Sequence, residues 1–188
     1  MSFDEYPHKA FACRSGWFAR VVVTHTGARQ ITDLLFPGEI SNCGSLVGGQ
    51  HAAPVLALTD AEICLVDGEE FVQHFQSTAH VVLGMWRSCL MQVLRMRDLL
   101  TALGTQASEA RFASFVLSLR ERLLEIGLAS PDNMPFPLRQ VQVADLLGMS
   151  QVQISRILNA LASDGIMHLA DDTIEFGNLD SLIRIARR

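Results

Sequence analysis

The sequence predicts an α+β protein in which a jelly-roll-like antiparallel β-roll, a long helix and a mainly helical domain follow one another. Short β-branched runs fill the first part, an apolar 3.5-residue repeat follows, and two short helical patterns joined by a glycine come last. With 188 residues, 49% of them hydrophobic, the chain can form two small cores. We expect a sensor-like roll at 1–78, a long helix at 79–104 and a C-terminal domain at 105–188.

The roll is predicted by four short runs that are rich in β-branched and other apolar residues. Turn signals such as Thr26-Gly27 and Asp67-Gly68 separate or close these runs. Short strands at such spacing are typical of an antiparallel roll or sandwich. The runs cover residues 18–24, 29–36, 55–58 and 62–66.

The long helix carries seven apolar residues at alternating intervals of four and three. A 3.5-residue period is typical of a coiled-coil seam, so we expect this face to form a homodimer interface. The alternative is an ordinary amphipathic core helix, and Leu83, Leu90 and Leu94 indicate that the helix also packs on its own domain. We expect Gly104 to end the helix. The seam residues are Val82, Trp86, Cys89, Val93, Met96, Leu100 and Leu103. Three arginines are expected to face solvent: Arg87, Arg95 and Arg97.

The C-terminal domain begins with a helix predicted at 109–126. Ser108 is its expected N-cap, and Gly127 lies where a helix commonly ends. The three prolines of residues 128–137 predict a loop after it.

Two short helices, at 139–147 and 151–163, follow this loop and are separated by a turn that contains Gly148. Together with the small Ala144 where the helices would cross, this pattern predicts a helix-turn-helix. Two short apolar runs flanking 170–172 then predict a β-hairpin, which would be a wing beside the motif.

Composition argues against several classes of protein. No apolar stretch approaches the ~20 residues of a membrane helix, and no apolar leader follows Met1, so we expect a cytoplasmic protein without membrane contact. The four cysteines form no close pair, and the sequence has no H-x-H pair. We therefore expect no metal site, no catalytic residues and no enzyme activity.

The net charge of −5, taken alone, argues against nucleic acid as a partner. However, residues 1–80 contain four basic and nine acidic residues, which account for the whole deficit. Within 135–163, Arg139 and Arg156 are accompanied by a single acid, Asp145. The acidic overall charge is therefore compatible with a C-terminal domain that binds DNA.

Four segments in this order are similar to those of a known family. They are SGWFARVVVTHTGARQITDLLFPGEI at 15–40, ALTDAEICLV at 57–66, ASEARFASFVLSLRERL at 107–123 and FPLRQVQVADLLGMSQVQISRILNALASDGI at 136–166. The chain resembles the CRP/FNR family of bacterial transcription regulators. The resemblance implies a cyclic-nucleotide-binding-like roll, a dimerisation helix and a winged helix-turn-helix. It further implies a homodimer that binds two-fold symmetric double-stranded DNA and contacts RNA polymerase.

The chain departs from the cyclic-nucleotide binders of the family. Their roll holds the cyclic phosphate with an Arg-Ser or Arg-Thr pair, which would fall here at about His51 and Ala52. A phosphate needs a cation and donors, so we expect no tight binding of cyclic AMP or cyclic GMP. Only 14 residues precede Ser15, so we expect the roll to be incomplete or the chain to be N-terminally short.

Neither cofactor known in the family is predicted here. The branch that binds an iron–sulfur cluster uses an N-terminal cysteine cluster, and only Cys13 lies in that region. Haem remains an alternative, as does a cluster, and the effector is unknown. The candidate haem ligands are His25, His51, His74 and His80.

The N-terminal residues of a recognition helix contact base edges in the major groove. Arg156 matches the family's arginine at its position and can donate two hydrogen bonds to guanine. Gln151 and Gln153 can pair with adenine or contact phosphate. The predicted DNA-binding residues are Arg139, Gln140, Ser150, Gln151, Gln153, Ser155 and Arg156.

The leading hypothesis is a homodimeric, sequence-specific transcription regulator that is not gated by cyclic AMP. A second hypothesis is a cupin-like metalloenzyme built on the β-roll, which would need clustered histidine and carboxylate ligands. A third is an interaction module whose winged helix binds another protein instead of DNA.

Overall fold

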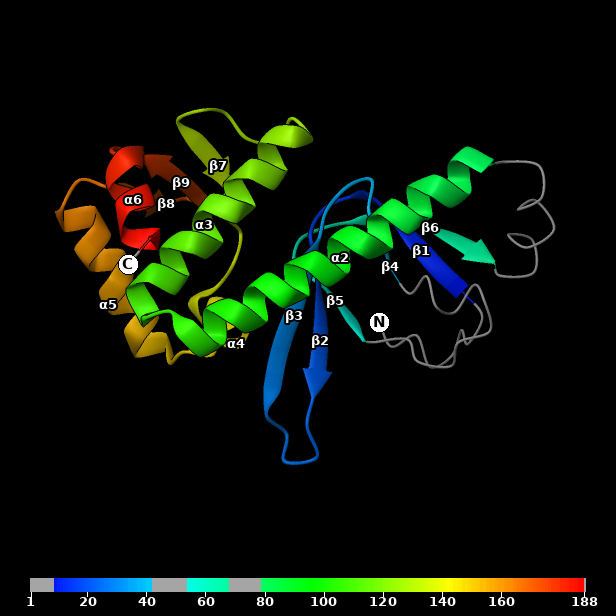
Figure 1. The fold of residues 1–188 in the computed structure, drawn as a ribbon, viewed down its shortest axis with the longest axis horizontal. Coiled ribbons are helices and arrows are strands. Elements are labelled where there is room, and N and C mark those ends of the chain that lie inside the picture. Colours follow the sequence, from blue (N-terminus) through cyan, green and yellow to red (C-terminus); the bar gives the residue numbers. More distant parts are fainter. Residues whose placement is uncertain (1–8, 42–53, 68–78, 188) are drawn as a thin grey trace. The chain divides into compact units, whose positions relative to one another are not determined.

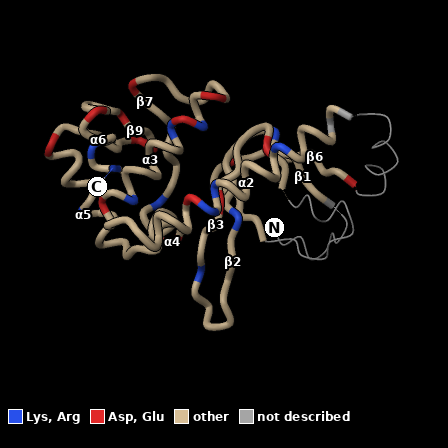
Figure 2. Tube along the Cα trace, in the orientation of Figure 1, with Lys and Arg blue, Asp and Glu red and all other residues tan. Residues whose placement is uncertain are grey.

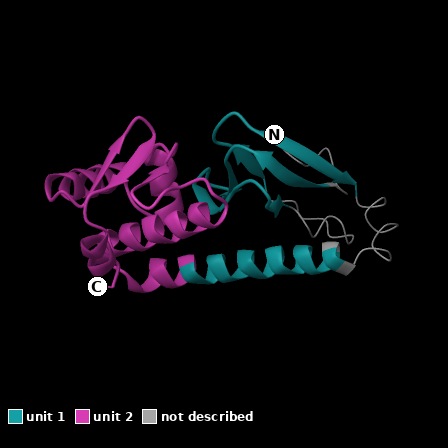
Figure 3. Ribbon diagram, turned by 90° about the horizontal axis from the view of Figure 1, so that it is seen from above, with its two compact units in different colours: residues 1–98 teal, residues 99–188 magenta. Residues whose placement is uncertain are grey.

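The computed structural model describes residues 9–41, 54–67 and 79–187 (Figure 1). Two compact units, 1–98 and 99–188, are distinguished by their internal contacts (Figure 3). None of the helices in these ranges is both long enough and apolar enough to cross a membrane.

In its described residues the first unit contains two three-stranded antiparallel sheets, which confirms the predicted roll. One sheet has the order β4-β1-β6, with bounds Ile40–Ser41, Lys9–Ser15 and Glu62–Asp67. The other has the order β3-β2-β5, with bounds Arg29–Leu35, Phe18–Val23 and Val55–Ala57. The sequence did not predict β1 and β4, whereas the four predicted runs all form strands.

The core of the roll lies between the two sheets. Phe11 of β1 and Phe18 of β2 are buried with ring centroids 5.5 Å apart. Gly16 joins these strands with φ +84°, and a Cβ there would lie 2.5 Å from both the Ala61 Cβ and the Asp60 carbonyl oxygen. A larger residue would therefore be both strained and crowded at this position.

The predicted long helix is α2 (Ala79–Thr105). Gly104 does not end it, because the helix continues for one further residue. Glycine is unfavourable inside a helix but compatible with helical geometry.

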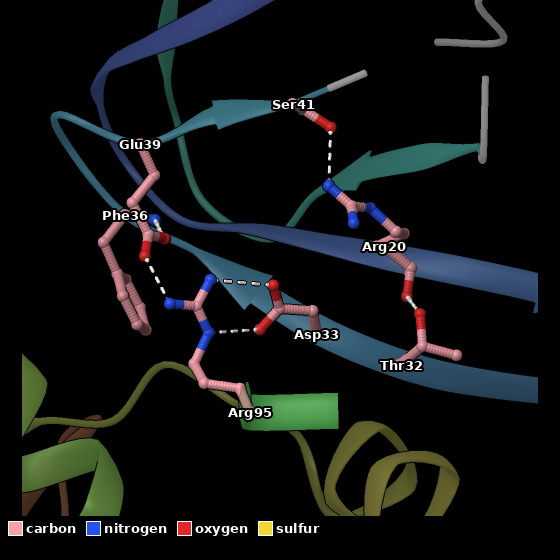
Figure 4. A network of polar contacts seen from close by, with 7 residues as sticks. All are labelled: Arg20, Thr32, Asp33, Phe36, Glu39, Ser41 and Arg95. Carbon is pink, nitrogen blue, oxygen red and sulfur yellow. Dashed lines mark hydrogen bonds and ion pairs between the residues drawn. The ribbon is translucent and has the colours of Figure 1, made fainter. Parts of the chain in front are cut away.

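The prediction that Arg95 of α2 faces solvent is wrong, because two carboxylates of the roll bind its guanidinium (Figure 4). Its Nε donates to Asp33 Oδ1 at 3.1 Å and its Nη2 donates to Asp33 Oδ2 at 3.0 Å. Its Nη1 lies 3.2 Å from Glu39 Oε1. Burial lowers the pKa of Arg95, but the hydrogen bonds and charge of Asp33, with the charge of Glu39, raise it overall. The guanidinium stays charged and holds α2 against the roll.

Further polar contacts join the two sheets near this salt bridge. Arg20 of β2 donates from Nη2 to the Ser41 Oγ of β4 at 3.1 Å, and Asp33 is the cross-strand partner of Arg20 (Figure 4). Glu39 also accepts the Phe36 backbone N–H at 2.9 Å, which closes the turn after β3. Polar contacts therefore join β2, β3, β4 and α2 within the first unit.

The second unit contains the helices α3 (Ser108–Glu125), α4 (Gln140–Leu147), α5 (Gln151–Ser163) and α6 (Leu179–Ala186). Its sheet has the order β7-β9-β8, with bounds Asn133–Pro135, Thr173–Phe176 and Met167–Ala170. The last two strands are the predicted hairpin, and Asp171 and Asp172 at its turn both have positive φ.

Three local predictions need correction. Ser108 is not the N-cap of α3 but its first helical residue, and the cap is Ala107 without a side-chain bond. The segment predicted as a loop contains β7, an edge strand in which Pro135 is tolerated. Helix α6 was not predicted, although Asn178 caps it by accepting the Ser181 N–H at 2.9 Å.

Candidate nucleic-acid interface

The turn between α4 and α5 depends on Gly148. This residue has φ +61°, and the Met149 N–H donates to the Ala144 carbonyl to close the end of α4. A Cβ at Gly148 would lie 3.0 Å from Leu103 Cδ2 at the end of α2. Both the backbone conformation and the close packing therefore favour glycine.

The start of α5 is fixed by a capping box. Ser150 Oγ accepts the Gln153 N–H at 3.2 Å, and Gln153 Oε1 accepts the Ser150 N–H at 2.9 Å. The side-chain oxygen of Gln153 is thus occupied, and only its NH₂ group is left to donate. The two-bond contact with adenine predicted for Gln153 would require this cap to open.

Helix α5 has one buried face and one solvent face. Ile154, Ile157 and Leu161 are buried in the second unit. Val152 and Arg156 are one turn apart on the opposite face, and the Val152 side chain is 68% exposed. This face presents one cation, one apolar side chain and several amide and hydroxyl groups. Such groups can hydrogen-bond and pack against the edges of base pairs.

The structure places the other predicted contact residues around this face. Gln151 and Ser150 are exposed at the start of α5, while Ser155 is half-buried. Arg139 and Gln140 are exposed at the start of α4, where the Arg139 N–H donates to Gln142 Oε1 at 2.7 Å. Val152 is not among the predicted DNA-binding residues, although an apolar side chain at this place can contact a thymine methyl group. What identifies Val152 as a contact residue is its exposure on a helix whose opposite face is buried.

Charge differs between the parts of this unit (Figure 2). The two motif helices hold Arg156 with one acid, Asp145, and Arg139 lies just before them. The β8–β9 turn carries Asp171 and Asp172, both exposed. Because carboxylates repel phosphate, the tip of this hairpin is unsuited to a close phosphate contact.

A second surface of interest is the exposed apolar stripe of α2. Trp86, Val93 and Leu100 are spaced by seven residues and are 74%, 62% and 71% exposed. The other seam residues differ: Met96 is exposed, whereas Val82, Cys89 and Leu103 are partly covered by their own chain. Leu83 and Leu90 are exposed beside the stripe.

The stripe faces away from the roll. Arg95 follows Trp86 by nine residues, which is about two and a half turns of an α-helix, so the two lie on opposite sides of α2. Since Arg95 binds Asp33 and Glu39, the salt bridge orients α2 with its apolar stripe outward.

The described residues include no group of three or more His, Cys, Asp or Glu placed to hold a metal. Burial, together with the charge of Glu39, raises the pKa of the Cys13 thiol to about 11. Cys13 is therefore protonated at neutral pH and is a weak nucleophile. His51, Ala52 and His74 lie outside the described residues, and His25 and His80 are exposed.

Comparisons with known proteins agree with this arrangement. Residues 110–185 match the family model of the Crp-like helix-turn-helix domain. The transcriptional regulatory protein Btr of Bordetella pertussis is 24% identical over 181 residues, which cover 95% of this chain and 74% of Btr. The fumarate and nitrate reduction regulatory protein of Escherichia coli K12 is 23% identical over 176 residues, or 94% of this chain and 70% of that protein. The C-terminal unit thus contains a Crp-like helix-turn-helix domain, and the chain as a whole resembles transcription regulators of the CRP/FNR family.

Solved structures of other proteins share the fold. FixK2 of Bradyrhizobium japonicum has a TM-score of 0.82 at 22% identity, covering 95% of this chain and 87% of FixK2. A CooA mutant of Carboxydothermus hydrogenoformans has a TM-score of 0.75 at 20% identity, covering 95% of this chain and 78% of CooA. The predicted resemblance and fold class are thereby confirmed, and the chain is a DNA-binding transcription regulator.

Proposed function

We propose that this regulator binds two-fold symmetric DNA as a homodimer, with one α5 helix in the major groove of each half-site. The observation that carries the proposal is the solvent face of α5, where Arg156 and Val152 lie side by side behind a capped N-terminus. A cytoplasmic location, contact with RNA polymerase and the lack of an enzyme activity belong to the same proposal.

Each predicted contact residue has a role in this proposal. Arg156 donates two hydrogen bonds to guanine O6 and N7, and Val152 packs on a thymine methyl group. The NH₂ group of Gln153 donates to a base or phosphate acceptor, and Gln151 and Ser155 contact neighbouring positions. Arg139, Gln140 and Ser150 bind phosphates, which fixes the register without specifying the sequence.

The homodimer forms through the predicted seam of α2. Its central members, Trp86, Val93 and Leu100, are large apolar side chains that a second α2 can cover. Burying apolar surface stabilises association by about 25 cal/mol for each Å² removed from water. Two copies of α5 then face the same side of the DNA duplex.

The dimer is not gated by cyclic AMP in this proposal. The family's phosphate-binding pair is replaced by His51 and Ala52, which lack a permanent cation. Calorimetry with cyclic AMP and cyclic GMP is expected to detect no micromolar binding, and a micromolar dissociation constant for either nucleotide would refute this part.

Arg156→Ala tests the role of α5. We expect specific affinity to fall by about 1–3 kcal/mol, with relaxed discrimination at one base pair of each half-site. Fluorescence anisotropy on an operator and its single-base variants measures both effects. Arg139→Ala, which removes the same charge, is the matched control and should weaken binding to all sequences about equally. Unchanged discrimination in Arg156→Ala would contradict the assignment.

A further inference from the structure

Arg111 links the corner between α2 and α3 to the helix-turn-helix. Its Nη2 donates to the Gln106 carbonyl at 3.0 Å, and its Nη1 donates to the Leu147 carbonyl at 2.7 Å. Gln106 lies between α2 and α3, and Leu147 is the last residue of α4. One planar guanidinium therefore spans two backbone segments that are 41 residues apart in the chain.

Two further contacts reinforce this corner. Gln106 Nε2 donates to Ser114 Oγ at 3.1 Å, and Ser114 Oγ donates to the Ala186 carbonyl at the end of α6 at 3.3 Å. Leu103, in the last turn of α2, packs where a Cβ of Gly148 would lie. The end of α2, the motif turn and α6 are thus joined around one short segment.

The electrostatics of this site favour a cation. The last carbonyls of a helix have no partner within the helix and carry the negative end of its dipole. Arg111 supplies a charged donor to the C-terminus of α4, directly before Gly148. Its bond with Leu147 fixes the position at which the chain turns into α5.

We propose that Arg111 is a positioning residue that fixes the helix-turn-helix relative to the end of α2 and thereby sets the half-site spacing that the dimer accepts. The inference rests on the proposed dimer, in which Leu100 and Leu103 bring the ends of two α2 helices together. The distance between the two α5 helices then depends on how rigidly each motif is held to its own α2.

Half-site spacing is a sensitive measure of this rigidity. One added base pair moves the half-sites apart by about 3.4 Å. It also rotates them by about 35°, because a helical turn contains about 10–10.5 base pairs. A rigid dimer cannot follow this change without losing contacts, whereas a loosened dimer can follow it in part.

The test compares wild-type protein with Arg111→Met on the selected operator and on versions with one base pair added or removed between half-sites. We expect the wild type to lose about tenfold or more in affinity on the altered spacers, in line with the loss of well-placed base contacts. Arg111→Met should bind the operator more weakly, because it lacks both guanidinium hydrogen bonds at the corner. Its affinity for the operator divided by its affinity for the altered spacers should be at least about threefold smaller than in the wild type.

Arg120→Met is the matched control on the same helix. Arg120 bonds the Pro131 carbonyl at 2.8 Å and lies 5.4 Å from the Phe176 ring centroid, away from the corner. The Arg120→Met protein should keep the wild-type spacing ratio, which is the affinity for the operator divided by the affinity for the altered spacers. We expect this even if the variant is less stable. Arg111→Lys, which keeps the charge and can bond one carbonyl at a time, should give an intermediate ratio and covers the case in which Arg111→Met does not fold.

A wild-type spacing ratio in Arg111→Met, or in Arg111→Lys where only that variant folds, would overturn the inference while leaving the proposed function intact. If the wild-type protein itself selected no operator, the proposed function would fail and this inference with it.

Discussion

Val93→Asp is expected to abolish dimerisation and, with it, high-affinity binding of the operator. Val93 is 62% exposed at the middle of the α2 stripe, with Trp86 and Leu100 one heptad away on either side. Pairing two such helices would bury two aspartates near the dimer axis without a counter-charge. An unpaired buried charge costs several kcal/mol, so we expect operator affinity to fall by about 100-fold or more.

The matched control for this variant is Met91→Asp. Met91 is also an exposed apolar residue of α2, but it lies two residues, or about 200° around the helix, from Val93. It should remain dimeric and keep its operator affinity. Sedimentation velocity measures the association, and fluorescence anisotropy measures the affinity. A dimeric Val93→Asp protein that still binds the operator would show that another surface joins the two copies.

Asp33→Asn is expected to destabilise the first unit strongly. The Asp33 side chain is 3% exposed and accepts two hydrogen bonds from Arg95, so the neutral amide leaves a largely buried guanidinium with less compensation. Breaking a buried pair by removing one partner costs about 3–5 kcal/mol. We expect a loss near the lower end, about 3 kcal/mol, because Glu39 still lies 3.2 Å from Arg95. Urea unfolding followed by the fluorescence of the buried Trp17 measures it.

The double variant Asp33→Leu with Arg95→Met separates charge imbalance from general disruption. Replacing a buried ion pair by apolar residues of similar size is often nearly neutral, so this protein should recover most of the lost stability. If Asp33→Asn unfolds within about 1 kcal/mol of the wild type, the salt bridge does not hold α2 on the roll.

The helix-turn-helix could be predicted closely because its signals are local. Ser150 and Gln153 lie three residues apart, and Gly148 directly follows the first helix, so the bounds predicted for α5 agree with the structure. The roll was harder to predict, because β1 is completed by partners far along the chain. A strand whose pairing is remote has a weak pattern of its own.

The contacts of Arg95 and Arg111 could not be predicted, because their partners also lie far along the chain. Arg95 meets Asp33 across 62 residues, and Arg111 meets Leu147 across 36. Sequence periodicity placed Arg95 off the apolar seam, and an arginine in that position is usually solvated. The 3.5-residue repeat did predict an apolar face, but only the structure distinguishes its exposed members, such as Trp86, from partly covered ones such as Val82.

Selection of bound DNA from a random pool by the full wild-type chain tests the central claim most directly. We predict enrichment of a two-fold symmetric sequence in which two half-sites are separated by a constant spacer. A pool without any enriched sequence would contradict the proposal that α5 reads DNA. Enrichment of a single isolated half-site would contradict the proposed homodimer.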